Sequence, residues 1–276
     1  MSFIKLGLME GKKLFWQREI YIALFLCTLF FVMAMISDPD PPGPLLFWKT
    51  LVSIVPYIGY WFIAILIVVG VARCLPFDRE QKMEELMLTY KKGRLPLLMV
   101  KQAVIFIYCA LIVLYFYLVA GITLATNYDT AGLFTQTKLS PNLSVHLNPE
   151  WTFAQLLLYE YGYMVLASYI FALFIFLLSL CIKRSVYIMM MAGSIFAGGE
   201  IFDKVIAKYI GTMELSNYLT PMYEYGFNGM LGFQYLGSFS IFSASEVYGL
   251  FLLIACLLFM LNLFTGRWRR YGSLGG

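Results

Sequence analysis

Long apolar runs separated by short polar segments are the main pattern along this chain. A helix needs about 20 mostly apolar residues to cross a bilayer. Five of the apolar runs are clear candidates and one is short. They predict six membrane-spanning helices, at 20–36, 51–72, 103–124, 161–182, the short run 186–201, and 247–264.

The composition supports a membrane protein. Of 276 residues, 61% are hydrophobic and only 13% are charged, too few ionisable side chains to cover a water-facing surface. We therefore expect an all-α polytopic membrane protein in which residues 1–276 form one transmembrane domain. With five Cys, no C-x-x-C spacing and His146 as the sole histidine, no metal site is expected, and the thiols are expected to be reduced.

The distribution of basic residues predicts the orientation. Loops on the cytoplasmic side of a membrane carry an excess of Lys and Arg. Sixteen of the 20 Lys and Arg residues fall in segments that six spans would place on one side, together with both termini. We therefore expect both termini in the cytoplasm and the chain in the plasma membrane, in a bacterium. The four basic residues on the other side are Lys49, Lys138, Lys204 and Lys208.

Residues 1–19 predict an amphipathic helix lying along the inner leaflet. The alternative is a frayed basic leader that only follows the charge rule. The predicted apolar side carries Ile4, Leu8, Leu14 and Phe15, with Gly7 and Gly11 between them, and the predicted basic side carries Lys5, Lys12 and Lys13.

The inner loop between the second and third spans predicts a short helix at 78–92. Asp78 can cap its first turn with Gln81 three residues later, and Gly93 and Pro96 mark its end. This helix either docks into a groove on another protein or packs onto its own bundle. Its apolar stripe is Met83, Leu86, Met87 and Tyr90, and Glu80, Glu84 and Glu85 remain for water or a partner.

The fifth span is short for a crossing and ends in Glu200. Residues 202–245, rich in Tyr, Phe and Gly, predict short outer or re-entrant helices, with a plain outer loop as the alternative. Glu160 sits at the outer end of the fourth span, just before residue 161, and lies either in a cavity or at the depth of the headgroups. Glu160 and Glu200 are the candidate residues of a translocation pathway.

Motifs for catalysis are missing from the sequence. It contains no G-x-x-x-x-G-K-[ST], no H-E-x-x-H and no G-x-S-x-G. We therefore expect no enzymatic activity in this chain and no cofactor bound by it.

The layout and one local stretch resemble the permease subunits of ABC-2 type ABC transporters. Residues 77–88, then Arg94-Leu95-Pro96 and Lys101, are similar to the coupling-helix region of that family, except that Lys82 or Met83 replaces the usual glycine. The layout covers nearly the whole chain, and the local motif about 25 residues. The resemblance implies that residues 1–19 are the connecting helix and 78–92 the coupling helix. The docking residues would be Asp78, Glu80, Met83, Glu84, Glu85, Leu86, Met87 and Tyr90.

The resemblance also implies partners. Two ATP-binding subunits would hold ATP and Mg and drive a pair of permeases, identical or homologous, to export a cargo. Aromatic and Met-rich spans suit an amphipathic or hydrophobic cargo such as a peptide, drug or lipid. Two alternatives stay open: a stand-alone secondary transporter or channel, and a membrane scaffold or immunity protein that binds without transport. Nucleic acid is not an expected partner, because the net charge is only +4.

Overall fold

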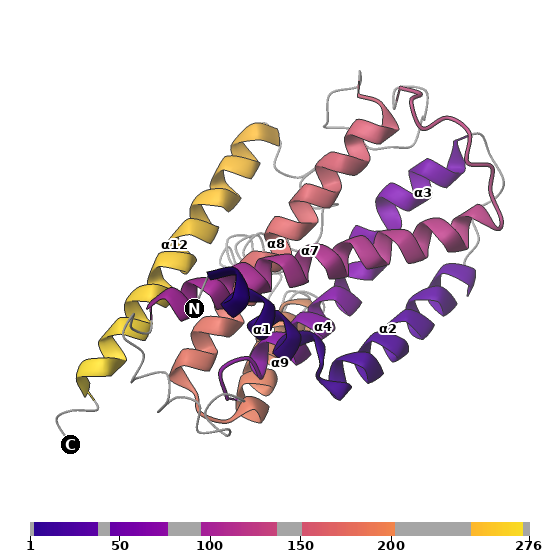
Figure 1. Cartoon of the computed structure of the whole chain (residues 1–276). Helices are drawn as coiled ribbons and strands as arrows, with labels where there is room; N and C mark the ends of the chain where they lie inside the picture. Colours follow the sequence, from indigo (N-terminus) through magenta and orange to yellow (C-terminus); the bar gives the residue numbers. More distant parts are fainter. Residues whose placement is uncertain (1–2, 38–44, 77–94, 137–150, 202–243, 273–276) are drawn as a thin grey trace, which may run out of the picture.

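The computed structural model describes residues 3–37, 45–76, 95–136, 151–201 and 244–272 (Figure 1). These residues form helices and connecting turns, with an isolated β-bridge between Gln136 and Thr152. The chain is therefore an α-helical protein, as predicted. The helices are α1 Phe3–Phe15, α2 Arg18–Ser37, α3 Leu46–Ile54, the π-helix η1 Val55–Gly59, α4 Tyr60–Ala72, α7 Leu95–Ala125, α8 Phe153–Cys181, α9 Ser185–Ile201 and α12 Ala244–Gly272.

Five helical segments of the described chain are long and apolar enough to cross a membrane, which makes this a multi-pass membrane protein. Helix α9 has 17 residues, so its length is about 25 Å, less than the roughly 30 Å of a bilayer core. It is not among the five. The five segments are Arg18–Ile36, Leu46–Ala72, Leu95–Ala125, Phe153–Cys181 and Tyr248–Gly266.

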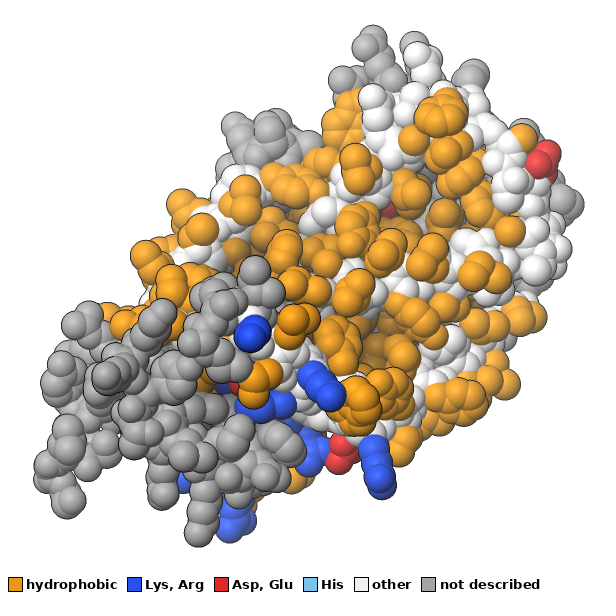
Figure 2. Space-filling model, viewed as in Figure 1, with side chains coloured by type: hydrophobic (Ala, Val, Ile, Leu, Met, Phe, Trp, Pro, Cys, Tyr) orange, Lys and Arg blue, Asp and Glu red, His pale blue; other side chains and the backbone are white. Residues whose placement is uncertain are grey.

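Helix α8 is the centre of the bundle. It contacts α7, α4, α9 and α12. Of its most apolar stretch of 18 residues, 72% is buried, whereas the corresponding share is 17% for α2 and 28% for α12. Figure 1 shows α12 running beside α8 and α2 at the opposite edge. Helices α2 and α12 leave large apolar side chains exposed, as expected at the edge of a membrane-spanning bundle, and Figure 2 shows apolar side chains over much of the visible surface.

Three spans begin earlier than the apolar pattern predicted, because polar residues extend them. Lys49 lies inside α3, Lys101 and Gln102 lie inside α7, and Glu160 lies inside α8. Pro96 is the second residue of α7, a position that tolerates proline because the first backbone N–H groups of a helix have no intrahelical partner.

The start of α8 is fixed by a capping box. Thr152 accepts a hydrogen bond from the backbone N–H of Gln155 at 3.4 Å, and the Gln155 side chain accepts one from the Thr152 N–H at 3.0 Å. Two backbone donors are thereby satisfied at the helix terminus. The cap places Glu160 two turns inside α8 rather than at its end.

Candidate functional site

A buried ion pair joins the N-terminal helix to the third span. Lys101 of α7 donates to Glu10 Oε2 of α1, and both side chains are buried, with 1% and 5% of their surface exposed. Lys13 donates to the other oxygen, Glu10 Oε1, at 2.9 Å. Because both carboxylate oxygens have a charged donor, the cost of burying Glu10 is offset by charge-assisted hydrogen bonds.

Two glycines of α1 face α7. Gly7 and Gly11 lie four residues apart, and a Cβ at each would make ordinary van der Waals contact with Val100 at 3.9 Å and with Val104 at 4.0 Å. Leu14 continues the buried face of α1. The described residues 3–15 are thus a helix that packs against α7.

The face that α1 buries differs from the predicted one. Leu14 and Phe15 pack inward as predicted, and Phe15 makes an edge-to-face contact with Tyr108, with ring centroids 5.5 Å apart. Leu8, however, is 70% exposed, and Lys13 is partly buried because it pairs with Glu10. The prediction failed for Leu8 and Lys13 because it left Glu10 off the inward face.

The ion pair also reaches the end of α4. The ammonium group of Lys101 lies 3.4 Å from the backbone carbonyl oxygen of Cys74, just beyond α4. Cys74 and Lys101 flank residues 77–94, the segment of the predicted coupling helix. The described structure therefore connects α1 to both helices that border this segment. The predicted docking residues Asp78, Glu80, Met83, Glu84, Glu85, Leu86, Met87 and Tyr90 all lie outside the described residues.

A second ion pair lies nearby, between Arg73 at the end of α4 and Glu19 at the start of α2. Both side chains are solvent-accessible, so water and salt screen it. Figure 2 shows Lys and Arg side chains gathered at one end of the molecule. The described basic residues at the ends of α1, α2, α4, α8 and α9 include Lys12, Arg18, Arg73, Lys183 and Arg184.

Glu160 is enclosed by the helices instead of lying among headgroups. Its side chain is 1% exposed, and Oε2 has no hydrogen-bond partner among the described residues. It belongs to the stripe of α8 that faces the bundle, with Leu156 one turn before it and Met164 one turn after it. A carboxyl group at such a position inside a spanning helix is a candidate functional group.

Two tyrosines from neighbouring helices pack against the residues that flank Glu160. The ring of Tyr117 of α7 contacts that of Tyr161, with centroids 6.2 Å apart, and the ring of Tyr248 of α12 contacts that of Tyr159. The buried Tyr117 hydroxyl has no hydrogen-bond partner in the described structure, whereas the Tyr248 hydroxyl donates to the carbonyl oxygen of Tyr159. The second predicted pathway residue, Glu200, belongs to the last turn of α9, and its side chain lies outside the described residues.

The position of the Tyr248 hydroxyl against α8 depends on a glycine. A Cβ at Gly162 would lie 2.7 Å from the Tyr248 hydroxyl oxygen, a distance that forces the tyrosine to move. The rings of Tyr159 and Tyr248 are in edge contact, with centroids 4.9 Å apart. Gly162 therefore allows Tyr248 to lie against α8 beside Glu160.

Glu160 was predicted from the sequence, whereas Glu10, Tyr117 and Tyr248 were not. The sequence does carry a signal for Glu10, because this acid lies on the same helical face as Gly7 and Leu14. Lys13 follows it three residues later, a spacing that allows an ion pair. No signal marked the tyrosines, since the chain has 20 of them. Within the described residues no group of three metal-ligating side chains occurs, and the five cysteines are free thiols.

Comparison with known proteins leaves the family open. No protein-family model matches the chain, and no curated protein matches it.

Proposed function

We propose that this chain is the membrane-spanning permease subunit of an ABC-2 type transporter. The observation that carries the proposal is the buried contact of Glu10, Lys101 and Cys74, which ties α1 to α4 and α7, the helices that precede and follow residues 77–94 in the sequence. An ATP-binding subunit that moved this segment would therefore move α1, α4 and α7 together. The resemblance of residues 77–101 to a coupling-helix region adds independent support.

In the proposed mechanism, separate subunits supply the energy for transport. Two ATP-binding subunits hold ATP and Mg, and this chain supplies no nucleotide-binding loop. Closure of those subunits on ATP moves the coupling segments of two permeases, identical or homologous, and rocks them about their shared interface. The cargo is an amphipathic or hydrophobic peptide, drug or lipid, and it leaves across the plasma membrane.

The proposal places both termini in the cytoplasm. Its support is the collection of basic side chains at one end of the molecule, since the cytoplasmic side of membrane proteins carries such an excess (Figure 2). In this arrangement α9 is the sixth crossing, a short one completed by the outer segment 202–245.

The test is co-purification of the tagged full-length chain from its native membrane. A P-loop ATPase is expected to copurify with it. The double variant Glu84→Lys, Glu85→Lys is expected to lose that ATPase while still inserting in the membrane. The matched control is Asp129→Lys, a charge reversal at an exposed position beyond the far end of α7, which retains the ATPase. Recovery without any ATPase contradicts the proposal.

A secondary transporter driven by an ion gradient is the second candidate, and the burial of Glu160 favours it. Such transporters place ionisable groups inside the bundle, near the binding site. Flux into vesicles that contain the purified chain alone, lost in Glu160→Gln, supports this candidate. Flux that needs ATP and a partner ATPase supports the first. A scaffold or immunity protein gives equal cargo retention with and without ATP.

A further inference from the structure

The outward face of α1 combines basic and large apolar side chains. Lys5, Leu8, Met9, Lys12 and Trp16 recur at intervals of three and four residues, the spacing that places side chains on one side of a helix. All five are exposed, and Leu8 and Trp16 each expose 70% of their surface. We call these five residues the outward face.

The orientation of this face is fixed by the opposite side of the helix. Glu10 and Leu14 are buried against the bundle, and Glu10 pairs with both Lys101 and Lys13. Rotation of α1 would break the buried ion pair, so this pair holds the outward face away from the helices.

The charge on the outward face is positive. Glu10 is the one acid within Phe3–Phe15, and it lies on the inward side, paired. Lys5 and Lys12 are two turns apart on the outward side. The ammonium group of Lys12 lies 4.8 Å from the ring centroid of Trp16, which holds a cation and an indole together.

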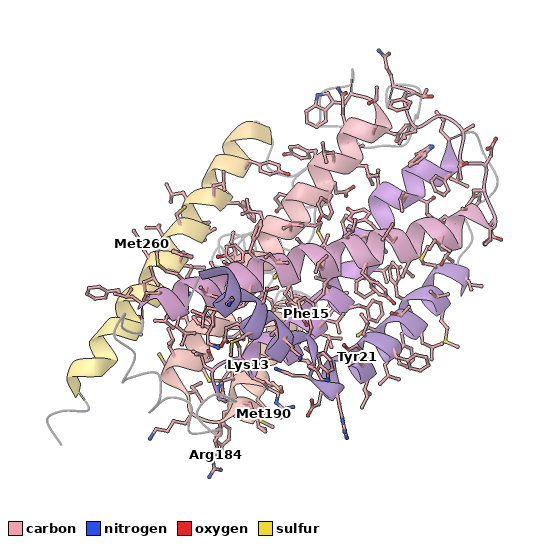
Figure 3. All side chains as sticks on the ribbon, in the orientation of Figure 1. Lys13, Phe15, Tyr21, Arg184, Met190 and Met260 are labelled. Atoms are coloured by element: carbon pink, nitrogen blue, oxygen red, sulfur yellow. The ribbon has the colours of Figure 1, made fainter. Side chains whose placement is uncertain are left out.

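The outward face continues into a lipid-facing surface. Helix α2 follows after Gln17 and exposes Tyr21, Ile22 and Phe25. Figure 3 labels Phe15 and Tyr21 where α1 meets α2, and Figure 2 shows basic side chains bordering the hydrophobic surface there. Trp and Lys at the edge of an apolar surface are typical of the membrane–water interface.

From these observations we infer that the outward face of α1 is a binding site for an anionic phospholipid of the inner leaflet, in the orientation proposed above. Leu8, Met9 and Trp16 enter the boundary between headgroups and acyl chains. Lys5 and Lys12 then contact the lipid phosphate. A docked protein would instead bury Leu8 and Trp16 against protein, without need of a negatively charged lipid. The inference depends on the orientation but not on an ATPase partner.

Native mass spectrometry of the purified full-length chain tests the proposal, with phosphatidylglycerol and phosphatidylcholine as probes. We expect the chain to bind phosphatidylglycerol more tightly than phosphatidylcholine. In Lys5→Gln, Lys12→Gln the affinity for phosphatidylglycerol is expected to fall by roughly 30-fold, about fivefold for each lysine near the surface. The affinity for phosphatidylcholine is expected to stay unchanged.

The matched control is Lys183→Gln, Arg184→Gln, which removes the same charge from the exposed turn between α8 and α9 (Figure 3). We expect it to retain tight binding. Equal losses in both double variants would mean attraction by net charge, and the proposal would be overturned. Equal binding of both lipids by the natural chain would overturn it as well.

Fluorescence in vesicles gives a second readout that does not depend on the lysines. Lipids brominated near the headgroup are expected to quench the chain's tryptophan emission, and Trp16→Phe is expected to remove part of that quenching. Identical quenching in the natural chain and in Trp16→Phe would show that Trp16 lies away from lipid, which overturns the proposal.

Discussion

Lys101 and Glu10 are 91 residues apart in the sequence, yet their side chains form an ion pair enclosed between α7 and α1. Removing Lys101 leaves the buried Glu10 with Lys13 as its remaining charged partner among the described residues, a loss of about 3 kcal/mol, the lower end of the range for breaking a buried pair. We therefore expect Lys101→Met to lower the stability of the purified chain by that amount. Replacing both residues, in Glu10→Leu, Lys101→Met, is expected to recover most of it, as measured by thermal unfolding in detergent.

The control for this pair is Arg73→Gln, which breaks the solvent-accessible ion pair with Glu19. Exposed pairs contribute about 0–1 kcal/mol, so this variant is expected to unfold almost as the natural chain does. A Lys101→Met chain as stable as Arg73→Gln would contradict the enclosed pair.

Two buried tyrosines of α7 are expected to respond in opposite ways to loss of the hydroxyl. Tyr108 donates to the backbone oxygen of Leu66 at 2.9 Å, so Tyr108→Phe is expected to cost about 0.5–1.5 kcal/mol. Tyr117→Phe removes a buried hydroxyl that has no described partner, and is expected to be neutral or stabilising. The midpoints of thermal unfolding of the two variants, measured under the same conditions, test this prediction. Equal destabilisation would show that Tyr117 has a partner outside the described residues.

Gly162 and Gly121 provide a comparison of close and open glycine sites. Gly162→Ala drives a methyl group against the Tyr248 hydroxyl and is expected to cost about 1–3 kcal/mol, through displacement of the tyrosine. At Gly121 on α7 nothing lies within 4 Å of an added Cβ, so Gly121→Ala is expected to be neutral or slightly stabilising. The measurement is again the midpoint of thermal unfolding. Similar midpoints for both variants would place α12 farther from α8 than described.

On the proposed function, the Glu10–Lys101 pair transmits motion, so its loss is expected to separate ATP hydrolysis from transport. A Glu10→Leu, Lys101→Met chain, assembled with its ATPase subunits, is expected to bind them normally. Its cargo flux per ATP hydrolysed is expected to fall well below that of the natural complex. Unchanged flux per ATP would mean that α1 has no part in transmission.

The sequence predicted the helices more accurately than their ends. Apolar runs marked the interior of each span, because lipid and the bundle core both require apolar side chains. Charged residues were read as boundaries, and this was wrong at Lys101 and Glu160. Lys101 has a partner 91 residues away, and Glu160 is buried on the helix that α7 and α12 pack against. Neither relationship can be read from local spacing.

The amphipathic pattern of residues 1–19 predicted a helix but only part of its buried face. Leu8 was grouped with Leu14 because both are apolar, yet a leucine costs nothing when it faces lipid. Glu10 decides the orientation, since its Oε2 pairs with Lys101 of α7 and holds the helix at one rotation, while its Oε1 pairs with Lys13 of the same helix. The segment 78–92, on which the functional prediction depends most, remains a prediction.

The π-helical turn η1 affects which side of the second span its side chains face. Buried residues recur there at every fourth position, an interval longer than the 3.6 residues of an α-helical turn, so a regular helix would carry them gradually off one side. A π-helical turn contains more residues than an α-helical turn, so η1 corrects part of that drift. Deleting one residue from Val55–Gly59 would swing one half of the span's inward side chains toward the lipid. The positions kept in phase are Phe47, Leu51, Val55, Gly59, Ile63, Ile67 and Val71.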